Sequence, residues 1–369
     1  MASVYQKRIA KAQAMMRDSG LDVLFVNNRE NLIYFTGLTE MECLAILIPR
    51  EGEACAVTLW LDGAYVQQAT GISAYGYHFP RENLAEKCIE RITKFGYTAP
   101  RIGFERYFVA FGVYDSLRRV FAENNFVAAS DLFYRLRSLK DEQELQLMRR
   151  AAASVVTGMD AAARAVRVGV RELEVLAEAE YAMLKAGSDG SPFRPQVVSG
   201  KRALLTHPCA TNKAIQAGEV VVIHLGATCE GYCAKMCRTA AVGDVPPGPV
   251  EVYELLRRAQ CAAIDGLRPG ATSDAVDAAA RRIVAAGGME PFYLDVAGYG
   301  VGTRQSEFYP IIGKGRSELI EAGMVVDLLL STIYRPDIGG PRVTDCIYVG
   351  PQQNEILTDY PRELIHVCA

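Results

Sequence analysis

The most constraining feature of the sequence is a pair of short apolar segments that carry charged and polar side chains in their interior. Val220–Leu225 is a β-branched apolar run, and Tyr232–Thr239 follows it at the spacing of a β-hairpin. His224 lies in the first segment, and Lys235 and Arg238 lie in the second. Because burying such groups is costly unless they are paired, we expect each of them to have a buried partner or a ligand.

Short glycine-containing motifs occur on both sides of this predicted hairpin. They are Val198-Ser199-Gly200 followed by His207, Leu225-Gly226, Gly231-Tyr232, Arg238-Thr239, Gly298–Gly302, Gly323-Met324-Val325 and Gly339–Asp345. This set resembles the catalytic half of the pita-bread (M24-type) family, which includes methionine aminopeptidase, Xaa-Pro aminopeptidase, prolidase and creatinase. Leu136–Lys140 and Asn31–Gly37 resemble other parts of the creatinase-type members, so the resemblance extends over nearly the whole chain.

The resemblance is weakest at the positions where the peptidases hold two metal ions. By alignment of the motifs, these positions are now His224, Lys235, Tyr299, Leu329 and Thr344. A dinuclear site needs oxygen or imidazole ligands in a fixed cage, and an ammonium, an isobutyl group and a phenol cannot form one. We therefore expect no metal and no other cofactor at this site.

The chain is expected to be an α+β protein of two domains. The resemblance implies a creatinase-type α/β domain over residues 1–137 and a pita-bread domain over residues 138–369, with the boundary near Ser138. Alternating strand and helix patterns in the first domain favour a mostly parallel or mixed sheet. Long amphipathic patterns in the second predict helices at Asp141–Val166, Glu172–Ala186, Val250–Leu267 and Thr272–Ala286.

Composition and charge exclude several classes of partner. Half of the residues are hydrophobic, 22% are charged, and the net charge is −3, which is typical of a globular protein and gives no basic footprint for nucleic acid or an anionic membrane. No apolar run is long enough to span a bilayer, and the first residues lack the apolar core of a signal peptide. We expect a cytoplasmic protein, and the resemblance implies a homodimer.

The sequence has 10 cysteines, which we interpret as reduced thiols. Cys229, Cys233 and Cys237 recur at a spacing that suggests a zinc site. In a strand, however, side chains at that spacing form a row on one face rather than surrounding a point, so a structural zinc site is disfavoured.

Two residues are candidates for catalysis in the region of the hairpin. His207 lies in a loop after Ser199-Gly200, and the resemblance implies that it moves protons at the scissile bond, although it can also be an ordinary surface histidine. Cys237 is either a nucleophile or an inert buried thiol. Lys235 is two residues away on the same strand face, and its charge is expected to lower the pKa of the thiol.

The pair of cationic candidates His224 and Lys235 leaves two alternatives open. Two facing cations repel each other unless an anion lies between them, which favours a bound carboxylate or other anionic ligand. Alternatively, Glu307 is an internal counter-ion for Lys235, or assists attack on the substrate.

Aromatic side chains and one arginine complete the candidate substrate site. Arg194 is a candidate carboxylate clamp, although a surface position is its simpler interpretation. The aromatic candidates, which are more often plain core residues, are Trp60, Phe193, Tyr232, Tyr299 and Tyr309.

Together with the resemblance to creatinase and ectoine hydrolase, these observations predict a metal-independent hydrolase that acts on a C–N bond in a small nitrogenous carboxylate. His207, Cys237 and Glu307 would be catalytic, while His224, Lys235, Arg194 and the aromatic residues would bind the substrate. The alternatives are a catalytically inactive pita-bread binding protein and an ordinary Xaa-Pro peptidase.

Overall fold

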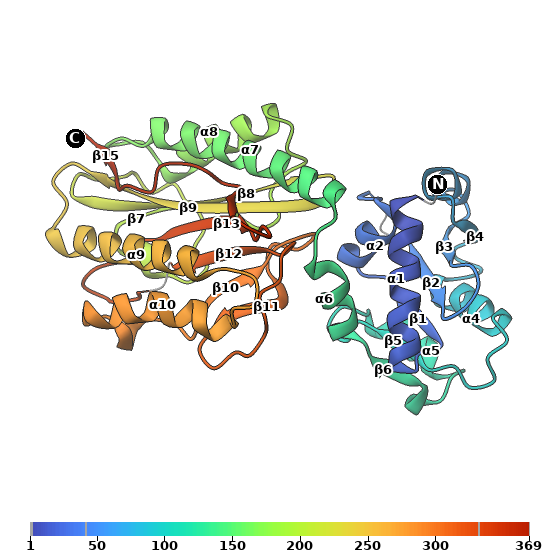
Figure 1. The fold of residues 1–369 in the computed structure, drawn as a ribbon. Helices are drawn as coiled ribbons and strands as arrows, with labels where there is room; N and C mark the ends of the chain where they lie inside the picture. Colours follow the sequence, from blue (N-terminus) through green and yellow to red (C-terminus); the bar gives the residue numbers. More distant parts are fainter. Residues whose placement is uncertain (1–2, 41–42, 331–332, 369) are drawn as a thin grey trace. The chain divides into compact units, whose positions relative to one another are not determined.

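The computed structural model describes residues 3–40, 43–330 and 333–368, without the side chains of Leu329 and Leu330. The chain forms two compact units, Met1–Arg137 and Ser138–Ala369, which are described separately (Figure 1). None of the described helices is long and apolar enough to cross a membrane.

The first unit is built on a six-stranded mixed sheet in the order β4-β3-β2-β1-β5-β6. β1 runs antiparallel to β2 and parallel to β5, as expected for a mixed sheet. Its strands are β1 (Val23–Val26), β2 (Ala45–Pro49), β3 (Cys55–Leu59), β4 (Ser73–Tyr77), β5 (Ile102–Phe104) and β6 (Phe126–Ala128). Its helices are α1 (Val4–Ser19), α2 (Arg29–Thr36), α3 (Gly63–Thr70), α4 (Leu84–Lys94), α5 (Phe111–Arg118), η1 (Glu123–Asn125) and α6 (Ser130–Ser138).

The second unit is built on a nine-stranded sheet in the order β11-β10-β12-β13-β9-β8-β7, with β14 and β15 attached to β13 and β9. Its strands are β7 (Gln196–Ser199), β8 (Glu219–Cys229), β9 (Tyr232–Val242), β10 (Val296–Gly300), β11 (Glu307–Gly313), β12 (Val325–Leu330), β13 (Val343–Tyr348), β14 (Glu355–Ile356) and β15 (Ile365–Val367). Its helices are α7 (Glu142–Ala165), α8 (Glu172–Lys185), η2 (Gly200–Leu204), α9 (Pro247–Gly266), α10 (Ser273–Ala286) and η3 (Glu290–Phe292).

The predicted hairpin is the pair β8–β9, whose two strands are 11 residues long each. Cys229 pairs with Tyr232, so Glu230-Gly231 form a tight turn in which both residues have positive φ. Such turns match the twist of the flanking strands. The register places His224 opposite Cys237 and Gly226 opposite Lys235.

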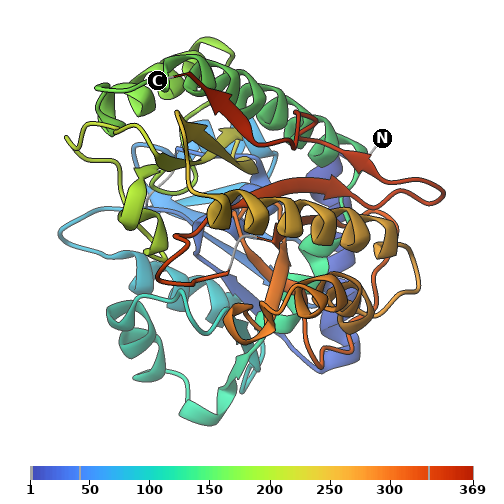
Figure 2. The same ribbon diagram turned by 90° about the vertical axis from the view of Figure 1, so that its left-hand side faces the viewer.

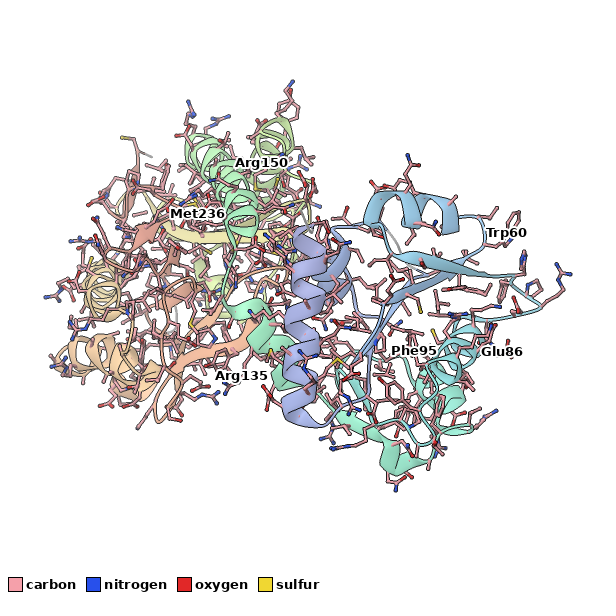
Figure 3. The ribbon with its side chains drawn as sticks, turned by 45° about the vertical axis from the view of Figure 1, so that its right-hand side comes forward. Trp60, Glu86, Phe95, Arg135, Arg150 and Met236 are labelled. Carbon is pink, nitrogen blue, oxygen red and sulfur yellow. The ribbon has the colours of Figure 1, made fainter. Side chains whose placement is uncertain are left out.

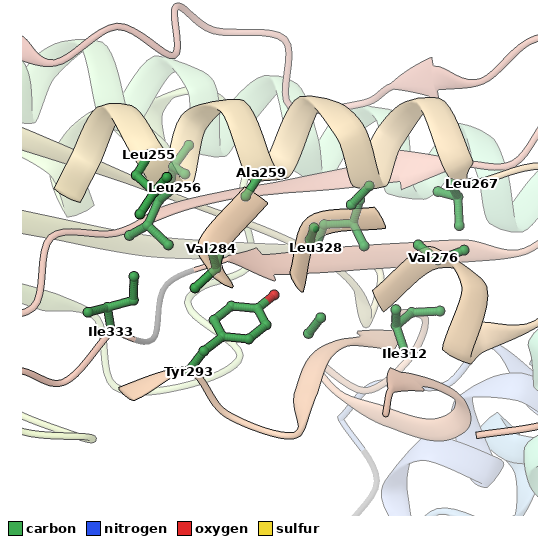
Figure 4. Close-up of a cluster of buried hydrophobic side chains, with 14 of the residues drawn as sticks. Leu255, Leu256, Ala259, Leu267, Val276, Val284, Tyr293, Ile312, Leu328 and Ile333 are labelled. Atoms are coloured by element: carbon green, nitrogen blue, oxygen red, sulfur yellow. The ribbon is translucent and has the colours of Figure 1, made fainter. Parts of the chain in front are cut away.

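The helices of this unit pack on the sheet in two pairs. α7 packs on β8 and β9, with α8 beside it next to β7, while α9 packs on β12 and β13, with α10 beside it next to β11 (Figures 1 and 2). Leu256, Val284 and Leu328 belong to the apolar core beneath the second pair (Figure 4). Asp141 caps α7 through reciprocal bonds with Glu144. The four helices predicted from periodicity are therefore confirmed, within a few residues at each end.

Candidate functional site

A cavity of about 680 Å³ lies in the second unit, on strands of the large sheet. It receives side chains from β7, β8, β9 and β10, from the loop after η2 and from the loop that precedes β11. The lining residues are Phe193, Arg194, Gln196, Thr206, His207, Pro208, Cys209, His224, Lys235, Leu294, Val296, Tyr299, Arg304, Gln305, Ser306, Phe308, Tyr334 and Arg342.

Several residues singled out from the sequence line this one cavity: Phe193, Arg194, His207, His224, Lys235 and Tyr299. The ring of Phe193 packs against Gly226, where any Cβ atom would overlap it. This close approach explains why the strand needs glycine there. The same ring lies 4.8 Å from the imidazole of His224, measured between centroids.

Lys235 is held by a buried carboxylate from a neighbouring part of the sheet. Its Nζ lies 2.5 Å from Oδ2 of Asp327 and donates a hydrogen bond of 3.0 Å to Ser306. Asp327 also accepts a hydrogen bond from the backbone N–H of Tyr299. Burial raises the pKa of the Asp327 carboxyl, and the ammonium of Lys235 opposes that rise. The counter-ion of Lys235 is thus Asp327, and the prediction that Glu307 takes this role is wrong.

Of the three polar residues predicted in the interior of the hairpin, His224 differs from Lys235 and Arg238 because its ring Nε2 has no hydrogen-bond partner in the described residues. Arg238 pairs with Asp345 at 2.8 Å and Lys235 pairs with Asp327, but Nε2 of His224 is buried without a hydrogen bond. Burial and the nearby Lys235 lower the pKa of His224 well below its usual value. The imidazole is therefore neutral, and the prediction of two facing cations is wrong.

Arg342, which precedes β13, contributes a buried guanidinium to the cavity. It is 4% exposed and donates to Oε1 of Gln196 at 3.0 Å and to the carbonyl oxygens of Ala203 and Leu205 at 3.0 and 2.6 Å. The residue therefore fastens the loop after η2, and its buried Nε is left without an acceptor in the described residues.

Glu172, at the start of α8, holds the other side of the same loop. Its buried carboxylate accepts hydrogen bonds from the backbone and hydroxyl of Ser199 and of Thr211, and it pairs with Arg202. Burial alone would raise the pKa of Glu172, but the hydrogen bonds from Ser199, Arg202 and Thr211 lower it. The segment between Ser199 and Thr211, which carries His207, is thus tied down at both ends.

Cys237 is placed as an inert thiol rather than as an activated nucleophile. Its side chain is fully buried in a small cluster with Ala203 and Val222 and does not line the cavity. Burial raises the pKa of Cys237 to about 12, so the prediction that Lys235 lowers it is wrong. A thiol with such a pKa is almost entirely protonated near neutral pH.

Four other predicted site residues do not line the cavity. Tyr232 is three residues from Lys235, so it faces the opposite side of the sheet, where its hydroxyl donates to Glu144 of α7. Tyr309 packs against the core beneath α9 and α10. Glu307 is buried, with Oε1 3.1 Å from the point where a Cβ on Gly302 would lie.

The fourth, Trp60, belongs to the first unit. It is 53% exposed, stacks on His78 and points away from its sheet (Figure 3).

The metal-ligand positions implied by the resemblance do not offer a set of donors for two cations. Lys235 and Asp327 neutralise each other at one position, and Tyr299 contributes a phenol at another. Thr344 contributes a buried hydroxyl, and the side chain of Leu329 lies outside the described residues. Over the described ranges, no group of three or more His, Cys, Asp or Glu side chains is arranged to hold a metal ion. Among the side chains described at these positions, an ammonium, a phenol and a threonine hydroxyl are not the ligands that a dinuclear centre usually has.

Sequence reasoning missed several residues of the site. Asp327 interrupts an otherwise apolar strand, which is a signal of a buried, partnered carboxylate that could have been used. Arg342 lies in a matched motif and could have been singled out as a buried cation. Gln196, Arg304, Gln305 and Tyr334 carry no such local signal, because the folding of distant loops brings them to the cavity.

Comparisons with known proteins agree with this architecture. Residues 146–351 match the model of metallopeptidase family M24, and residues 8–139 match the creatinase/prolidase N-terminal domain. The chain is 29% identical over 360 residues to the uncharacterized peptidase YqhT of Bacillus subtilis, covering 97% of this chain and 99% of that protein. It is 27% identical over 363 residues to the Xaa-Pro dipeptidase of Pyrococcus horikoshii, covering 98% and 99%. The solved structure of an Xaa-Pro dipeptidase from Bacillus anthracis matches with a TM-score of 0.90 at 26% identity, covering 98% of this chain and 100% of that one.

Proposed function

The chain belongs to metallopeptidase family M24, and we propose that its cavity binds a small carboxylate without a dinuclear metal centre. This proposal is supported by the positive charge of the side chains that line the cavity. Arg194, Arg304 and Arg342 line the cavity, and none of the lining side chains in the described residues is acidic. A concave, largely apolar site with convergent basic groups suits a small organic anion.

The observation that carries this proposal is the state of Arg342. Its guanidinium is buried, and the described residues provide it with carbonyl and amide oxygens but no carboxylate. A buried cation without a counter-ion is costly, and a ligand carboxylate would compensate it with charge-assisted hydrogen bonds. Such bonds contribute about 1.5–3 kcal/mol, or roughly 10- to 150-fold in affinity.

The chemistry that follows binding is proposed to be metal-independent hydrolysis of a C–N bond. His207 lines the cavity in an exposed loop and is the lining residue suited to move a proton to the leaving nitrogen. His224 is less suited to that step, because its lowered pKa makes it a weak base. We propose that His224 binds the substrate instead of transferring a proton.

The names of the relatives favour a second candidate, hydrolysis of Xaa-Pro dipeptides, because two Xaa-Pro dipeptidases from Pyrococcus match over 98% of this chain. That reaction would need a metal in a family of metallopeptidases. Hydrolysis of Ala-Pro would be measured with added Mn²⁺ or Co²⁺, using the Pyrococcus furiosus enzyme as the positive control. Metal-stimulated turnover by this chain would establish the second candidate and refute the first.

Carboxylate binding is tested from the side of the ligand, which avoids any damage to the fold. N-acetyl-L-proline and its C-terminal amide differ in the carboxylate alone, and calorimetric titration compares their affinities. We expect the acid to bind at least 10-fold more tightly than the amide. Equal affinities, or no binding of the acid, would refute the proposal. Turnover of any ligand that binds would then be compared in the wild type and His207→Gln, and unchanged rates would exclude the proton-transfer role.

A further inference from the structure

We infer that the ligand of this cavity is a carboxylate that carries no ammonium group, with an uncharged amide where a free dipeptide has its amine. N-acylated amino acids and N-acylated dipeptides are the chemical class that fits. This inference rests on the proposed function and specifies the ligand more narrowly.

The described lining of the cavity offers no carboxylate that would pair with a ligand ammonium. The described residues that line the cavity include no aspartate and no glutamate. Asp327 is fully buried outside the lining, and its oxygens are taken by Lys235 and by the backbone of Tyr299. A ligand ammonium would therefore lose its hydration without gaining a counter-ion.

The buried cation of the lining would repel a ligand ammonium. Arg342 contributes a guanidinium group to the lining and is almost completely buried, with no carboxylate partner among the described residues. A ligand carboxylate would neutralise this charge, and an ammonium on the same ligand would restore the imbalance. A like charge within about 6 Å of a partly buried guanidinium lowers affinity by roughly 10- to 100-fold.

Two residues of the cavity lining carry buried polar atoms without partners, and an amide has the complementary groups. Nε2 of His224 and Oε1 of Gln305 are buried without hydrogen-bond partners in the described residues, and both side chains line the cavity. An amide offers one N–H donor and one C=O acceptor. The Gln305 oxygen accepts the N–H, and the neutral His224 ring pairs with the carbonyl when Nε2 carries the proton.

The remaining wall of the cavity is apolar and accepts the hydrocarbon part of the ligand. It is formed by the side chains of Phe193, Leu294, Val296, Phe308 and Tyr334. Burial of an acyl group and a side chain against this wall gives affinity without further charges. An acylated amino acid combines all of these features in one small molecule.

The test uses two ligands that differ in a single charge. Gly-L-Pro carries an ammonium at neutral pH, and N-acetyl-Gly-L-Pro has an amide there. Calorimetric titration of the full chain at pH 7 is expected to give at least 10-fold tighter binding of the acetylated form. Equal binding, or tighter binding of Gly-L-Pro, would overturn the inference while leaving carboxylate binding intact. If neither dipeptide binds better than its C-terminal amide, the inference and the proposed function both fail.

A variant that adds an acidic side chain to the lining should weaken the preference for the acetylated ligand. Gln305→Glu adds a carboxylate to the lining with almost no change in shape, so we expect it to reduce the preference for N-acetyl-Gly-L-Pro at least 10-fold. Gln352→Glu is the matched control, because Gln352 is exposed and does not line the cavity. The control is expected to keep the wild-type preference. An unchanged preference in Gln305→Glu would count against the inference.

Discussion

The ion pair between Lys235 and Asp327 gives the sharpest prediction about stability. Its two charged atoms are 2.5 Å apart, and both side chains are at most 5% exposed. At an effective dielectric constant of about 20, the direct attraction is roughly 6–7 kcal/mol, and desolvation of the two ions offsets much of it. Asp327→Asn keeps the shape but leaves the ammonium buried without its partner, which costs about 3–5 kcal/mol.

Thermal unfolding followed by far-ultraviolet circular dichroism measures this loss. For a unit the size of residues 138–369, we expect Asp327→Asn to lower Tm by about 6–20 °C. Lys235→Met combined with Asp327→Asn removes both charges and keeps an acceptor for the Tyr299 N–H, so it should recover most of the loss. Arg150→Gln breaks an exposed pair with Glu230 and serves as the control, with an expected cost below about 1 kcal/mol.

A melting temperature of Asp327→Asn within about 2 °C of the wild type, which is a shift below about 1 kcal/mol for a unit of this size, would show that the ion pair contributes little to stability. The cost assigned to the buried charge would also be wrong if the double variant were less stable than Asp327→Asn, because the single variant is the one that keeps an uncompensated charge.

Three further predictions concern titration, reactivity and the loop of the cavity. The pKa of His224 is lowered in the folded state, so the unfolded state binds more protons below pH 6.5. The free energy of unfolding therefore falls by up to about 1.4 kcal/mol for each pH unit below 6.5. Above pH 6.5 the neutral ring causes no such loss of stability. His224→Gln should flatten the decline of Tm between pH 7 and 5, and parallel curves would contradict the assignment. Because burial raises the pKa of Cys237 to about 12, iodoacetamide at pH 8 should label the exposed Cys368 and leave Cys237 unmodified. Peptide mass spectrometry would measure the labelling, and comparable labelling of the two cysteines would contradict the prediction. Glu172→Gln removes the charge that holds the loop of His207, so it should lower the free energy of unfolding by about 3 kcal/mol and weaken the binding of N-acetyl-L-proline. An unchanged Tm and an unchanged affinity would show that Glu172 does not hold this loop.

The sequence predicted the architecture because the signals of fold are local and repeated. The period of apolar residues located α7 to α10, and the glycine motifs located the hairpin that carries His224 and Lys235. The same local rules would have excluded Tyr232, since three residues along a strand reverse the direction of a side chain. Tyr232 belongs to a matched motif, but its position in the strand points its side chain to the other face of the sheet.

The charge balance of the site could not be read from local patterns. Lys235 and its partner Asp327 are far apart in the sequence, and β9, β13 and β12 must align before the carboxylate reaches the ammonium. Glu307 follows a matched motif and is also buried, but the carboxylate that pairs with Lys235 is that of Asp327. The burial that raises the pKa of Cys237 likewise depends on the packing of η2 over β9 and not on neighbours in the chain.

The hydrogen bonds that hold the segment between Ser199 and Thr211 should affect the rates at which a ligand binds and leaves. Glu172 fixes the two ends of this segment, and Arg342 grips the carbonyl oxygens of Ala203 and Leu205 in its middle. An anion that docks on Arg342 therefore draws on the same guanidinium that anchors this segment. Arrival of the ligand should make the backbone amides around His207 exchange with deuterium more slowly, and departure should be governed by how readily that anchor relaxes.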